Sequence, residues 1–134
     1  MTQPRAILVV DDDPDIRKTL SMVLERNGYA VKAAASGREA RSVLASWRPD
    51  LVILDIIMET DMEGFEVAKE IRLNPGLAGI PIFMLTSFLE KLRLEGAEKF
   101  QGLFGDDWPA QWLFEKPVDT KKLLRKIQVV LAEH

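Results

Sequence analysis

The sequence predicts an α/β fold in which a five-stranded parallel sheet carries helices on both faces. Short apolar runs alternate along the chain with segments whose apolar residues recur at helical spacing. Right-handed crossovers between parallel strands place such helices on both sides of a doubly wound sheet. With 134 residues the chain has the length of a single domain. We therefore expect one domain over residues 1–134, with the strand order 2-1-3-4-5.

The expected strands are short and rich in aliphatic residues, and turn residues bound them. They are residues 6–10, 29–34, 51–55, 80–86 and 112–115. The first helix begins at Asp13-Pro14, a capping residue followed by a first-turn proline, and stops at Asn27-Gly28. The remaining helices are expected over residues 36–49, 65–72, 89–100 and 119–133.

Composition excludes several classes of function. The 18 basic and 21 acidic residues give a formal charge of −3, so nothing favours nucleic-acid binding by this domain. The chain has no cysteine, which removes disulfides, zinc-thiolate sites and thiol nucleophiles. No apolar stretch is long enough for a membrane span or a signal peptide. We expect a soluble cytoplasmic protein with no output domain after the last helix.

Acidic side chains gather where two of the predicted strands end. Asp55 closes the apolar run 51–55, and Asp11 and Asp12 directly follow the run 6–10. Parallel strands deliver their carboxyl ends to one rim of the sheet, where α/β proteins bind ligands at the point of strand reversal. The three carboxylates should converge there, because strands one and three flank that point.

Three carboxylates in one place repel one another unless a cation is shared between them. Hard oxygen ligands with room for water suit Mg²⁺. Thr86 and Lys116 end or follow the fourth and fifth strands, so they add a hydroxyl donor and a positive charge at the same rim. Such a site would neutralise a phosphoryl group in transfer, and Asp55 could accept it as an aspartyl phosphate.

Several motifs together resemble the receiver domain of two-component response regulators, a family with a flavodoxin-like fold. The resemblance covers essentially the whole chain, and its motifs occur in the family's order. They are Val9-Val10-Asp11-Asp12-Asp13, Asp55 followed by Met58 and Gly64, Thr86-Ser87 after an apolar strand, and Lys116-Pro117.

The resemblance implies a phosphoacceptor and a set of metal ligands. Asp55 would take the phosphoryl group from a sensor histidine kinase or a histidine phosphotransfer protein. Asp12, Asp55 and the Ile57 carbonyl would bind Mg²⁺, with Asp11 acting largely through water. The domain would then be no classical enzyme, although it would catalyse its own Mg²⁺-dependent phosphorylation and its dephosphorylation.

The resemblance also implies how the signal is read. Thr86 would sense the phosphoryl group, and Lys116, aimed by a cis bond to Pro117, would pair with it. The surface of the fourth helix, fifth strand and last helix would change and be recognised by a downstream protein. A homodimer is a further candidate assembly.

The chain departs from the family pattern at several positions. Glu59 stands where the family commonly has proline, and Leu113 occupies the usual aromatic switch position. The segment between Thr86 and Lys116 is also longer than usual. An alternative is therefore a phosphorylation-independent interaction module with the same fold. Ile57 and Phe88, bulky where the hydrolytic water would pass in the family, predict slow self-dephosphorylation.

Two other interpretations of the acidic run do not fit the sequence. Asp11-x-Asp13-x-Asp15 imitates the start of a calcium-binding loop, but Ile16 stands where that loop requires glycine. A haloacid-dehalogenase-type phosphatase should have its second acidic pair after its lysine, whereas Asp106-Asp107 precedes Lys116.

Overall fold

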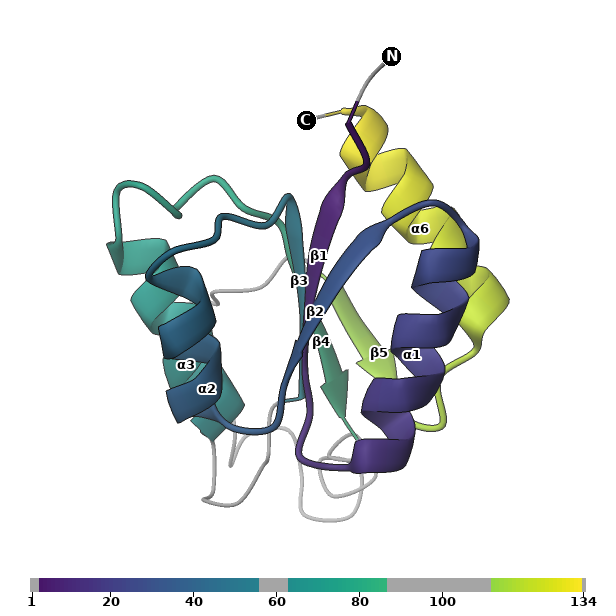
Figure 1. Cartoon of the computed structure of the whole chain (residues 1–134), viewed down its shortest axis with the longest axis horizontal. Coiled ribbons are helices and arrows are strands. Elements are labelled where there is room, and N and C mark those ends of the chain that lie inside the picture. Colours follow the sequence, from purple (N-terminus) through teal and green to yellow (C-terminus); the bar gives the residue numbers. More distant parts are fainter. Residues whose placement is uncertain (1–2, 56–62, 87–111, 134) are drawn as a thin grey trace, which may run out of the picture.

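A single parallel sheet organises the molecule, seen in Figure 1 in a computed structural model that describes residues 3–55, 63–86 and 112–133. The strand order is β2-β1-β3-β4-β5, and every neighbouring pair is parallel. The strands are β1 (Ala6–Val10), β2 (Ala30–Ala34), β3 (Leu51–Asp55), β4 (Ile82–Thr86) and β5 (Trp112–Glu115). The predicted strand number and order are confirmed.

Helices cover both faces of the sheet. The described helices are α1 (Pro14–Arg26), α2 (Gly37–Leu44), α3 (Glu63–Leu73) and α6 (Thr120–Ala132). In Figure 1, α2 and α3 lie against one face, and α1 and α6 lie against the other. The doubly wound α/β prediction is thereby confirmed. The helix expected over residues 89–100 lies outside the described residues.

The core forms two layers because side chains alternate between the faces of a strand. In β1, Leu8 and Val10 pack toward α2 and α3, whereas Ile7 and Val9 pack toward α1 and α6. All five residues of β3 are buried, as expected for a central strand covered on both sides. A buried central strand holds its last residue, Asp55, in a fixed place at the rim.

The ends of α1 follow the capping pattern expected from the sequence. The Asp13 carboxylate accepts a hydrogen bond from the Asp15 amide, and Pro14 begins the helix. At the other end, the Gly28 amide donates to Glu25 and the Tyr29 amide donates to Leu24, which is a Schellman closure. Gly28 has a φ of 88°, a conformation that favours glycine.

Several predicted boundaries differ from the observed ones, including the start of α3 at Glu63 instead of residue 65, and three of the differences have a local reason. The second helix ends at Leu44 instead of Pro49, because the amides of Ser46 and Trp47 both turn back to the Val43 carbonyl. Trp47 still packs against the core from beyond the helix.

The other two boundaries concern strand starts. Strand β2 begins at Ala30, since the Tyr29 amide belongs to the closure of α1. Strand β4 begins at Ile82, after Pro81, which accepts a hydrogen bond from the Val52 amide but cannot donate one.

The start of β1 and the end of α6 lie at the end of the sheet opposite the carboxyl ends of the strands (Figure 1). Arg5 joins them, because its guanidinium donates to the Leu131 carbonyl at 3.0 Å. In the part of the chain that the structure describes, no helix is long and apolar enough to cross a membrane.

Candidate functional site

The carboxyl ends of the strands bring the predicted acidic residues together. Asp11 follows β1 and Asp55 ends β3, and these two strands are direct neighbours with Val10 opposite Leu54. Oxygen atoms of Asp11, Asp12 and Asp55 all lie within 4.8 Å of one another. The sheet order alone explains this convergence, since β1 and β3 flank the point where the order reverses.

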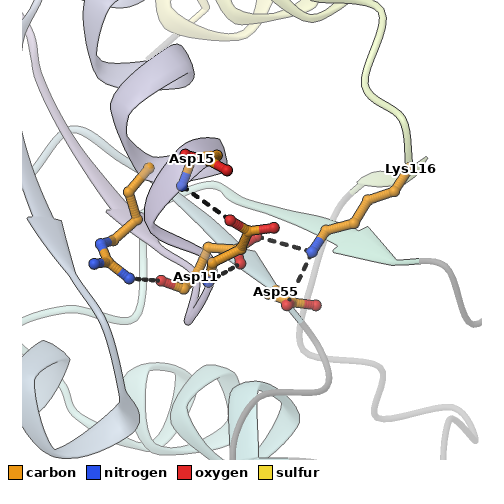
Figure 2. A network of polar contacts seen from close by, with 6 residues as sticks. Asp11, Asp15, Asp55 and Lys116 are labelled. Carbon is orange, nitrogen blue, oxygen red and sulfur yellow. Dashed lines mark hydrogen bonds and ion pairs between the residues drawn. The ribbon is translucent and has the colours of Figure 1, made fainter.

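Lys116 reaches into this cluster from the far side of β4 (Figure 2). Its Nζ lies 3.0 Å from Asp55 Oδ2 and 2.9 Å from Asp11 Oδ2. The Asp55 contact is a hydrogen bond as well as an ion pair. The Asp11 contact is an ion pair only, and within the described residues Asp11 Oδ2 accepts no hydrogen bond. The Lys116–Pro117 bond is cis, as in the family pattern.

Burial makes the charges in this cluster strongly dependent on one another. The Asp11 side chain is fully buried and that of Asp55 is 7% exposed, whereas Asp12 faces solvent. Burial by itself lowers the pKa of Lys116, but the short contacts to the Asp11 and Asp55 carboxylates outweigh it and raise that pKa above its ordinary value. Lys116 is therefore positively charged at neutral pH.

One lysine cannot balance three carboxylates. Asp11 Oδ2 is buried without a hydrogen bond in the described part of the chain, and the exposed Asp12 adds a further negative charge beside it. A divalent cation with oxygen ligands and several waters suits such a group, so the residues present fit Mg²⁺.

The remaining predicted site residues are only partly placed. Thr86 is the last residue of β4, with Glu115 of β5 opposite it, and its backbone therefore reaches the same rim. The side chain of Thr86 lies outside the described part of the structure. The whole of Ile57, Glu59 and Phe88 also lies outside it. Phe114, next to Leu113, packs beside Phe83 on the α1–α6 side with ring centroids 5.2 Å apart.

A cavity of about 260 Å³ lies between α1 and the loop that leads into α6. Mostly apolar groups line it, including Ile16, Leu20 and Val118, and Lys116 forms part of its wall. The cavity thus adjoins the acidic cluster through the lysine that pairs with Asp55.

Two contacts at this rim were not anticipated from the sequence. Arg17 Nη1 donates to the Asp11 carbonyl at 2.8 Å, and Glu63 Oε1 accepts the Gly37 amide at 2.6 Å. A basic residue one turn into the helix after the acidic run was a visible signal for Arg17. Glu63 gave no such signal, because its partner is 26 residues away in the sequence.

Comparison with known proteins agrees with this geometry. The model of the response regulator receiver domain matches residues 7–128. The chain is 38% identical over 128 residues to the response regulator MprA of Mycolicibacterium vanbaalenii, an alignment that covers 96% of this chain and 51% of that protein.

Solved structures give the same result. The chemotaxis response regulator CheY4 of Vibrio cholerae superimposes with a TM-score of 0.78 at 35% identity, covering 95% of this chain and 98% of that one. A receiver domain of a signal transduction histidine kinase from Syntrophus aciditrophicus gives 0.80 at 28% identity, covering 96% and 91%.

The chain therefore belongs to the response regulator receiver domain family, which acts in two-component signalling. Phosphorylation and the use of Mg²⁺ are general features of this family, and its members receive phosphoryl groups from histidine kinases. The chain spans about half the length of the curated relatives that it matches.

Proposed function

We propose that this domain accepts a phosphoryl group on Asp55 from the phosphohistidine of a sensor histidine kinase or a histidine phosphotransfer protein. The observation that carries this proposal is the contact of 3.0 Å between Asp55 Oδ2 and Lys116 Nζ, with Asp11 and Asp12 beside it. A nearly buried carboxylate with a fixed cation at its side is a nucleophile placed where phosphoryl charge can be neutralised.

Mg²⁺ is the proposed cofactor, held by Asp12 and Asp55 with Asp11 acting largely through water. The Ile57 carbonyl, which lies outside the described residues, is a further proposed ligand from the family pattern. When bound, Mg²⁺ supplies positive charge to the phosphoryl oxygens and removes the repulsion between the carboxylates.

The transfer is a single displacement at phosphorus. A carboxylate oxygen of Asp55 forms a bond to phosphorus while the P–N bond to the donor imidazole breaks and its electron pair returns to the imidazole nitrogen. Lys116 needs no proton transfer for this step, because its ammonium is already charged. Its role is to stabilise the phosphoryl oxygens as they move onto Asp55. Hydrolysis of the product is proposed to be slow.

We propose that the conformational change caused by phosphorylation is transmitted from the site through Thr86 and β5. Thr86 would contact the phosphoryl oxygens, and Lys116 would follow them. Both changes would alter the surface of the fourth helix, β5 and α6 that an unidentified downstream protein recognises. We place the domain in the cytoplasm, without a nucleic acid or a membrane as its own partner, and a homodimer is a candidate assembly.

Phosphoramidate tests the proposal because its P–N bond resembles that of phosphohistidine. Wild-type protein incubated with Mg²⁺ and phosphoramidate should gain the mass of one phosphoryl group. Asp55→Asn should gain none. Asp50→Asn is the matched control, because Asp50 precedes the same strand at its opposite end, and it should be phosphorylated like the wild type.

The same experiment separates this function from the alternative. A wild-type protein that gains no mass with Mg²⁺ present would favour a phosphorylation-independent interaction module. The feature of the sequence that supports this alternative is Leu113, which occupies the usual aromatic switch position.

A further inference from the structure

Arg17 holds the main chain at the point where β1 ends and the acidic cluster begins. It lies in the first part of α1 and is half-buried. Its Nη1 donates to the carbonyl oxygen of Asp11 at 2.8 Å, while its own amide donates to the Asp13 carbonyl at 3.1 Å as α1 begins. The side chain thus returns from the helix to the preceding strand end.

The Asp11 carbonyl is the first on this strand to lie beyond the sheet. Pairing of β1 with both neighbours ends at Val10, opposite Ala34 and Leu54. A carbonyl that is withdrawn from water needs a hydrogen-bond donor, and Arg17 supplies one. A guanidinium donor makes this bond stronger than one between neutral groups.

This bond completes the fixation of Asp11. The amide of Asp11 donates to the Ala34 carbonyl at 3.1 Å, Oδ1 accepts the Asp13 amide at 2.9 Å, and Oδ2 pairs with Lys116 at 2.9 Å. With Arg17 on the carbonyl, all four polar atoms of Asp11 have a partner. The orientation of the Asp11–Asp12 peptide is thereby set.

That peptide decides where Asp12 lies. Asp12 is exposed, so packing does not restrain its side chain. Its carboxylate nevertheless lies within 4.8 Å of those of Asp11 and Asp55. A metal ligand held in place before binding costs less entropy when the metal arrives. The main chain of the strand end has to provide this restraint.

We propose that Arg17 is a positioning residue for the cation site: it orients the Asp11–Asp12 peptide so that Asp12 points at the cation before the cation binds. The inference deepens the proposed function and rests on it for the identity of the cation. In this role Arg17 acts through the Asp11 main chain and is not itself a ligand of the cation.

The sign of the effect distinguishes positioning from simple electrostatics. A positive side chain near a cation site repels the cation, so removing its charge alone should tighten Mg²⁺ binding. Loss of a positioning hydrogen bond should weaken it. Arg17→Met removes the charge and the donor together, and Arg26→Met removes a charge from the last turn of the same helix. Arg26→Met therefore controls for the loss of one positive charge from α1 at a distance from the site.

The experiment is calorimetric titration of each folded variant with Mg²⁺ and no phosphodonor. We expect Arg17→Met to bind about tenfold more weakly than wild type, about 1.4 kcal/mol. Arg26→Met should bind equally or slightly more tightly. Arg17→Lys should lie between wild type and Arg17→Met, because a lysine keeps the charge but offers a compact donor on a different stem.

Two further measurements make the outcome decisive. Circular dichroism checks that each variant is folded. If Arg17→Met does not fold, the Mg²⁺ affinity of Arg17→Lys is compared with that of wild type instead. In the amide NMR spectrum, Mg²⁺-free Arg17→Lys should show its largest shifts at Asp12 and Asp13. A folded Arg17 variant that binds Mg²⁺ as tightly as Arg26→Met would overturn the inference.

Failure of the proposed function would look different. A wild-type protein that binds Mg²⁺ but gains no phosphoryl group would refute the proposed function, while weaker Mg²⁺ binding by Arg17→Met would still support the positioning role. Conversely, unchanged Mg²⁺ binding by Arg17→Met would remove the positioning role and leave phosphorylation of Asp55 intact.

Discussion

The ammonium group of Lys116 pairs with the carboxylate of Asp55 at 3.0 Å across the end of an intervening strand. Asp55 ends β3, Lys116 follows β5, and β4 separates the two strands. The same ammonium pairs with Asp11 at 2.9 Å. Lys116 is 18% exposed at its side chain, so water weakens these interactions only in part.

Removing the Lys116 charge should destabilise the protein in the absence of Mg²⁺. Lys116→Met leaves two nearly buried carboxylates without their cation, and we expect the free energy of unfolding at neutral pH to fall by about 2–4 kcal/mol. Urea denaturation measures the change. Lys121→Met, an exposed lysine on α6, is the control and should change stability by less than about 0.5 kcal/mol.

The pH dependence of that difference follows from the sign of the pKa shift. The folded-state pKa of Lys116 is raised above its ordinary 10.5, so its contribution to stability is fully present below 10.5 and is lost as the pH rises through the folded-state value. As the pH is raised from neutral, the stability gap between wild type and Lys116→Met should therefore persist until the pH passes that value, and then narrow. A gap that closes near neutral pH would show that Lys116 is not charged as described.

Asp12→Asn should separate the stability of the site from its affinity for Mg²⁺. Without Mg²⁺, the loss of one of three mutually repelling carboxylates should leave stability unchanged or raise it by up to about 1 kcal/mol. Wild type should gain about 2.7 kcal/mol at a Mg²⁺ concentration one hundred times the dissociation constant. The variant should gain much less at that concentration. Thermal unfolding with and without Mg²⁺ gives both quantities.

Asp15→Asn provides the control for this pair of measurements. Asp15 lies on α1 close to the site, as Figure 2 shows, but it is not part of the carboxylate cluster. Its variant should keep the full response to Mg²⁺. An Asp12→Asn protein with the wild-type response would contradict a cation site built on Asp12.

Gly37→Ala should be unfavourable although alanine favours helices. A Cβ at Gly37 would lie 2.5 Å from Glu63 Oε1, so the glutamate would have to leave the Gly37 amide. Loss of this charge-assisted hydrogen bond, about 1.5–3 kcal/mol, outweighs a gain in helix propensity of up to about 1 kcal/mol. We expect a net loss of about 1 kcal/mol in the free energy of unfolding.

A double-mutant cycle checks the cause. In the Glu63→Ala background no carboxylate remains to be displaced, so adding Gly37→Ala should be neutral or stabilising. Two variants whose effects simply add would mean that Glu63 and Gly37 do not interact as described.

The exposed pair Arg41–Glu70 should contribute far less than the pair at the site. Arg41 Nε lies 2.7 Å from Glu70 Oε2, shorter than either Lys116 contact, but both side chains are about half exposed. Arg41→Gln should cost no more than about 1 kcal/mol, and 1 M salt should remove most of that cost. A larger, salt-resistant loss would show that distance, rather than burial, sets the strength of these pairs.

Local patterns were sufficient for most of the fold. The apolar runs, the Asp13-Pro14 start of α1 and its Asn27-Gly28 stop all depend on residues close together in the sequence. Each predicted a real element or boundary, although β2 and β4 begin later than predicted. The end of α2 was missed because Ser46 and Trp47 fold back on Val43, a choice between two local hydrogen-bond patterns that composition does not reveal.

The meeting of Asp11, Asp12 and Asp55 was predictable from the chain, because it follows from their positions at strand ends and from the rule for doubly wound sheets. Which charges pair there follows from the packing of side chains and could not be predicted. Lys116 pairs with both Asp11 and Asp55, and Arg17 donates a hydrogen bond to the Asp11 carbonyl. A shift of about an ångström between elements would break these contacts. Packing, and not sequence pattern, sets positions with that accuracy.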